Sequence, residues 1–177
     1  MVDENFEWKW IELKEIARKS YFNVIDTLKY LRQRLSNRER ELLDEIRKHA
    51  ERGLFPDPEY LESLAENLKS VNIFLIAALF HREVARYLTA IMLKSGKYAE
   101  EALGAYLKSI SLLLGVSMLK DDEKFLNETL RTLGELIYLA DDSRVNALIS
   151  KLIVVIREMI DKIFRVLSTK RDKNEWD

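Results

Sequence analysis

The 177-residue sequence has no cysteine, only five glycines and two prolines, and a formal net charge of -1. The lack of cysteine excludes a disulfide framework, a thiol nucleophile and a thiolate metal site. So few glycines and prolines leave little material for the turns of a β-rich fold. The near-zero net charge argues against coating nucleic acid by bulk charge, although it leaves room for a local basic face. Together these shortages favour an all-α protein.

Familiar catalytic and metal-binding motifs are also missing. Neither His49 nor His81 belongs to a Glu-x-x-His or His-Glu-x-x-His metal motif. The sequence has no glycine-rich phosphate loop, no calcium loop and no Gly-x-Ser-x-Gly nucleophile motif. We therefore expect a protein that is not an enzyme, with no cofactor and no metal.

Hydrophobic residues make up 47% of the chain and charged residues 33%, enough apolar material for a core and far too much for a disordered chain. Abundant Glu, Lys and Arg with a single glutamine is a composition typical of thermophile proteins. The first residues are acidic, unlike a signal peptide. The most apolar stretch, residues 71–80, is about half of the ~20 residues that a membrane span needs. We expect a cytoplasmic protein that does not enter a membrane.

Apolar residues recur at steps of three and four, which predicts about six helices. Their expected ranges are 5–35, 36–52, 58–94, 98–119, 121–140 and 142–169. Ser36 and Glu39 form a capping-box pattern that favours a break after the first helix over one unbroken helix. Asp57 is a good N-cap before Pro58, and a kink is expected near residues 70–72 because the third helix is unusually long. Its second part, about 71–94, is apolar nearly all round and should be central.

Short connections between these helices predict an up-and-down bundle in a single domain, residues 1–169, followed by a charged, frayed tail, 170–177. In the fourth helix, Gly104 and Gly115 suggest that a neighbouring helix crosses closely there. The fifth helix is expected to use an apolar stripe of Leu126, Leu130, Leu133 and Ile137.

Arg82 and Arg86 lie one turn apart on the most apolar helix, beside His81 and Glu83. Guanidinium groups bind carboxylates and phosphates, so this cluster is a candidate site for a small anionic ligand. The alternative, which we prefer, is an internal ion-pair network, because a buried unpaired charge is costly.

A basic zone surrounds the first helix junction, and phosphate contact is its functional interpretation. Interleaved acids such as Glu41 and Asp44 favour the simpler interpretation of a solvated, mixed-charge face. The basic zone comprises Arg32, Arg34, Arg38, Arg40, Arg47, Lys48 and Arg52.

The sixth helix has two apolar stripes side by side, about twice the arc that an outer helix of a monomer needs. The second stripe is either buried by its own chain, paired with a second copy, or covered by another protein. It is the candidate interface, and it comprises Ile149, Ile153, Ile156, Ile160, Phe164 and Leu167.

The leading hypothesis is a non-enzymatic helical interaction or scaffold subunit that assembles through apolar helix faces, with a protein partner or a second copy of itself. The alternative is an accessory subunit of a nucleic-acid-processing complex, of the replication or CRISPR type, that contacts phosphates through Arg32, Arg34 and Arg38. A second alternative is a small anionic-ligand binder that uses Arg82 and Arg86.

Overall fold

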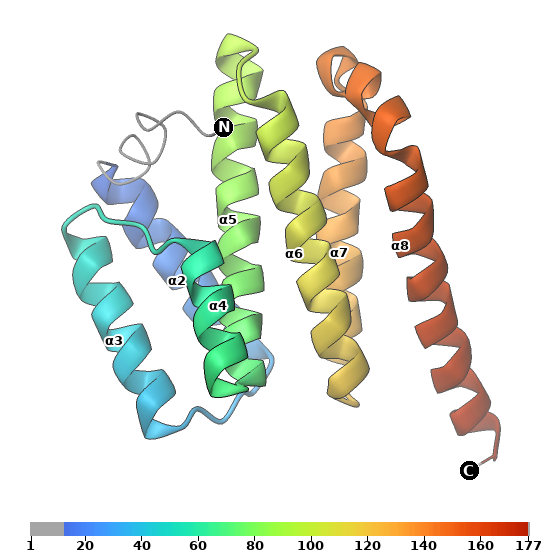
Figure 1. The fold of residues 1–177 in the computed structure, drawn as a ribbon, viewed down its shortest axis with the longest axis horizontal. Coiled ribbons are helices and arrows are strands. Elements are labelled where there is room, and N and C mark those ends of the chain that lie inside the picture. Colours follow the sequence, from blue (N-terminus) through green and yellow to red (C-terminus); the bar gives the residue numbers. More distant parts are fainter. Residues whose placement is uncertain (1–12, 177) are drawn as a thin grey trace. The chain divides into compact units, whose positions relative to one another are not determined.

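The computed structural model describes residues 13–176, apart from the side chains of Ile153, Leu167 and residues 170–176. This part of the chain contains helices and connections and no strand, so the all-α prediction is confirmed. Seven helices lie within it (Figure 1): α2 Lys14–Tyr30, α3 Asn37–Glu51, α4 Pro58–Leu68, α5 Val71–Ser95, α6 Ala99–Leu119, α7 Glu123–Ala140 and α8 Ser143–Trp176.

The predicted number of about six helices is wrong because the expected third helix, 58–94, is two helices. Lys69 ends α4 in the left-handed conformation (φ 49°). Ser70 then caps α5, since its Oγ accepts a hydrogen bond from Ile73 N at 3.2 Å. The expected kink is therefore a full break.

Most of the helix ends follow the predicted caps. The Ser36–Glu39 capping box is present, and α2 ends at Tyr30, earlier than the expected 35. Asp57 caps α4, and Asp122 caps α7. The predicted start of the first helix lies outside the described residues. At the other end, α8 continues past the expected 169 to Trp176.

The chain divides into two compact units, Met1–Tyr87 and Leu88–Asp177, called unit 1 and unit 2 below. A single up-and-down bundle is therefore not confirmed, and the single domain 1–169 stays a prediction. Helix α5 contributes residues to both units. Every side chain from position 75 to position 83 is buried. The central place expected for 71–94 stays a prediction.

In unit 1, α2 packs on α3. The core includes Leu31 and Leu61, each 1% exposed, and Phe80, whose ring meets Phe55 edge to face at 5.5 Å between centroids. Burial also raises the pKa of the Tyr21 hydroxyl on α2.

In unit 2, α6, α7 and α8 pack against one another and run in alternating directions (Figure 1). Leu114, Leu126 and Ile163, one from each helix, form a buried cluster. Arg144 at the start of α8 donates to the Met92 carbonyl oxygen at 2.9 Å, which ties α8 to the end of α5. A Cβ added at Gly104 or Gly115 would meet no described atom within 4 Å, so the expected close helix crossing there is wrong.

Candidate interaction surfaces

The charged cluster on α5 forms a network inside unit 1. Arg86 Nη1 donates to Glu83 Oε1 at 2.6 Å, and Asn23 Nδ2 donates to Glu83 Oε2 at 3.1 Å. Arg82 Nη2 donates to Thr27 Oγ1 at 3.3 Å. Each cation therefore has a partner on its own or the neighbouring helix, which is the arrangement expected of an internal network.

Access to this cluster is limited. Arg82 is 2% exposed, and His81, with Nε2 3.7 Å from Glu62 Oε2, is 7% exposed. A solute anion would have to displace protein groups to reach Arg82. The network is also separate from the basic zone, because Asn72, which contacts Arg34, precedes Arg82 by ten residues, or about 15 Å along α5.

The basic zone divides into two parts. The first part lies on the α2–α3 connection and the start of α3, and comprises Arg32, Arg34, Arg38 and Arg40. The second part lies on the second half of α3 and at its C-cap, and comprises Arg47, Lys48 and Arg52. The expected pairing with interleaved acids is realised between Arg47 and Asp44, at 3.6 Å.

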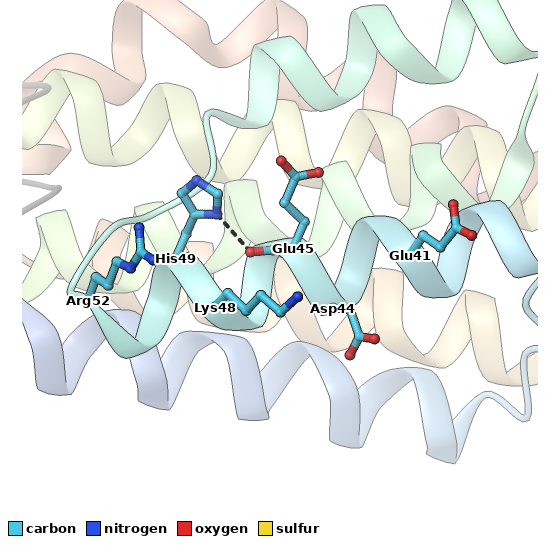
Figure 2. A pocket seen from close by; sticks show the side chains of 6 residues that line it. All are labelled: Glu41, Asp44, Glu45, Lys48, His49 and Arg52. Atoms are coloured by element: carbon cyan, nitrogen blue, oxygen red, sulfur yellow. Dashed lines mark hydrogen bonds between the residues drawn. The ribbon is translucent and has the colours of Figure 1, made fainter.

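A shallow hollow lies over the second part of the basic zone, on the surface of α3 (Figure 2). His49 Nδ1 lies 2.7 Å from the Glu45 carbonyl oxygen, so this nitrogen carries the proton and donates. Acids and bases alternate around the hollow, and no group of three or more metal-ligating side chains occurs among the described residues. The lining fits a solvated, mixed-charge face, and comprises Glu41, Asp44, Glu45, Lys48, His49 and Arg52.

Helix α8 leaves much of its apolar arc uncovered. Its buried side chains among those described are Val145 and Ile163. Around the axis of α8, Phe164 lies on one flank of Ile163 and is 62% exposed. Val155 lies on the opposite flank and is 41% exposed. Of the remaining candidate interface residues, Ile149, Ile156 and Ile160 are half-buried, while the side chains of Ile153 and Leu167 lie outside the description.

The predicted stripe on the fifth helix is partly wrong. In α7, Leu126 is buried, but Ile137 is 57% exposed and Leu130 38% exposed. The helix turns inward instead through Phe125, Thr129 and Thr132, all 1% exposed or less. The two threonines satisfy their hydroxyls by donating to backbone carbonyl oxygens four residues earlier, which lets a polar residue occupy a core position. Tyr138, 81% exposed, joins the outer face of α7.

By length and composition α6 is the one helix among the described residues that meets the requirements of a membrane span. Just over half, 56%, of its apolar window is buried, and the core helix of a soluble protein can pass the same test. Comparisons with protein-family models, with characterised proteins and with solved structures found no match.

Proposed function

We propose that the protein is a non-enzymatic helical subunit that assembles with a second copy of itself through the outer apolar face of α8. The observation that carries this proposal is Phe164, a large apolar side chain left 62% exposed beside half-buried Ile160, one turn away, and half-buried Ile156, two turns away. A continuous apolar strip of this kind is typical of an interface.

The distribution of exposed apolar side chains supports a location in unit 2. Among the described residues, unit 1 exposes four large apolar side chains: Leu13, Phe22, Tyr30 and Tyr60. Unit 2 exposes more than twice as many, and six of them lie on α7 and α8: Leu130, Ile137, Tyr138, Val154, Val155 and Phe164. Single exposed apolar residues are ordinary, but their concentration on two neighbouring helices favours docking of another helix there.

A second copy is favoured as the partner because the rim of the α8 strip carries both signs of charge. Arg157 and Asp161 are exposed and lie one turn apart beside Ile160 and Phe164. In an antiparallel pair of α8 helices related by a two-fold axis, Arg157 of one copy can face Asp161 of the other. Such self-complementary contacts are what closed two-fold dimers require.

The test compares two phenylalanine variants by size-exclusion chromatography with light scattering. Phe164→Glu places a charge in the proposed interface, and Phe22→Glu does the same at a similarly exposed site, 52%, on α2. We expect wild type and Phe22→Glu to be dimers and Phe164→Glu to be a monomer with an unchanged circular dichroism spectrum. Three proteins of the same mass would contradict the proposal.

A further inference from the structure

A second surface, in unit 1, is strongly cationic and is not used by the proposed assembly. It lies where α2 ends, α3 begins and α4 gives way to α5 (Figure 1). Six exposed side chains, here called the cationic patch, make it up: Lys29, Arg32, Arg34, Arg38, Arg40 and Lys69.

The backbone beneath the cationic patch is held in place. Leu31, 1% exposed, anchors the α2–α3 connection, and Gln33 N donates to the Leu28 carbonyl oxygen at 3.2 Å. Asn72 Nδ2 of α5 donates to the Arg34 carbonyl oxygen at 3.0 Å. That bond brings Lys69, three residues before Asn72, to the same end of unit 1.

The six cations of the patch are not held at ion-pair distance by acids in the part of the chain that the structure describes. Among the described residues, none of its six side chains forms an ion pair or a side-chain hydrogen bond. Glu39, the acid between Arg38 and Arg40, is 8% exposed and is occupied in the capping box and in hydrogen bonds from Asn72 Nδ2 at 3.0 Å. The mixed-charge interpretation, which fits the second half of α3, therefore does not fit its start.

Helix stabilisation explains only some of these cations. Lys29, Arg32 and Lys69 lie at the carboxyl ends of α2 and α4, where positive charge is favourable. Arg38 and Arg40 lie in the first turn of α3, where positive charge is unfavourable. Arg38 and Arg40 are therefore unfavourable for α3 and have no ion pair among the described residues. This arrangement is expected where the two arginines bind an anion from another molecule.

We propose that the cationic patch binds the phosphate backbone of a single-stranded nucleic acid. The patch has four arginines within residues 32–40, and arginine binds phosphate oxygens in a bidentate manner. Tyr30, 51% exposed on the last turn of α2, provides an aromatic face next to Arg32 on which a base can stack. A single strand offers both kinds of group, phosphates for the arginines and bases for the ring face, whereas a run of carboxylates offers only the first.

The test measures fluorescence anisotropy of labelled, mixed-sequence RNA and DNA single strands with the full chain. Wild type should bind, with affinity that falls steeply between roughly 50 and 200 mM salt. Arg34→Ala/Arg38→Ala should weaken binding at least about tenfold and reduce the slope of log affinity against log salt by ~1.4, the value for two lost phosphate contacts.

The matched control is Arg18→Ala/Arg52→Ala, which removes two exposed arginines from the opposite end of unit 1 and should bind as wild type does. A second readout is the melting temperature of the free protein. Arg38→Glu should raise it, because an acid suits the first turn of α3, while weakening binding at least as much as the double alanine variant does.

Three results would overturn the proposal. They are no binding by wild type at low salt, equal weakening in the patch and control variants, and preferential binding of polyglutamate or phosphatidylserine vesicles over oligonucleotides. The outcome is independent of the assembly proposal, since Phe164→Glu leaves the cationic patch intact.

Discussion

The glycines of α6 show how an exposed position differs from a packed one. Gly104 and Gly115 are exposed, and an added methyl group would enter open space at both. Alanine at either position should therefore raise the free energy of unfolding by about 0.5–1 kcal/mol, because it loses less backbone entropy on folding than glycine. Urea denaturation measures this directly. A loss of stability instead would mean that another helix packs against these positions.

Asp142 provides a residue with a defined pH dependence. Its carboxylate caps α8 and accepts hydrogen bonds from Arg144 Nε at 3.0 Å and Nη2 at 2.9 Å, which lower the pKa of Asp142 from 3.8 to about 2 and raise that of Arg144. A lowered folded-state pKa means that the stabilisation is complete above roughly pH 4 and is lost as the pH falls to about 2.

Asp142→Asn keeps an oxygen that can cap α8 but removes this titration. We therefore expect the melting temperature of the variant to change less than that of wild type between roughly pH 4 and pH 2. Differential scanning calorimetry across that range is the measurement. Parallel curves for the two proteins would show that Asp142 is not held ionised in the folded state.

For the helices, capping residues predicted the helix ends better than apolar periodicity predicted the buried faces. Ser36 and Asp57 act through bonds to residues two or three positions away, so sequence spacing is enough to predict them. The inward face of α7 was predicted wrongly because Thr129 and Thr132 look polar in the sequence. Their hydroxyls are satisfied within the helix, which only the structure reveals.

The break between α4 and α5 was missed because Lys69 is not a residue that usually adopts positive φ. Lys69→Gly should raise the free energy of unfolding by about 0.5–1 kcal/mol by removing the strain of a side chain in the left-handed region, and Lys69→Val should lower it. Both variants lose the charge, so their difference in chemical denaturation isolates the backbone effect. Equal stabilities would mean that residue 69 leaves this conformation at no cost.

For the chain as a whole, the sequence predicted the all-α class, and it offered both surfaces as candidates that remain predictions. It did not predict the division into two units, because that depends on which helices contact one another and not on any local signal. The basic zone also needed the structure for its interpretation. Spacing allowed Arg38 and Arg40 an acidic partner three or four residues on, Glu41 and Asp44, whereas neither arginine has an ion pair among the described residues.

The proposed assembly depends on the apolar face of α8 being an interface between copies of the chain. Sedimentation equilibrium of wild-type protein over a wide concentration range tests this without any substitution. We predict a mass twice the 20.9 kDa of the chain, with dissociation only on strong dilution. A mass of one chain at every concentration would show that the α8 face does not join two copies.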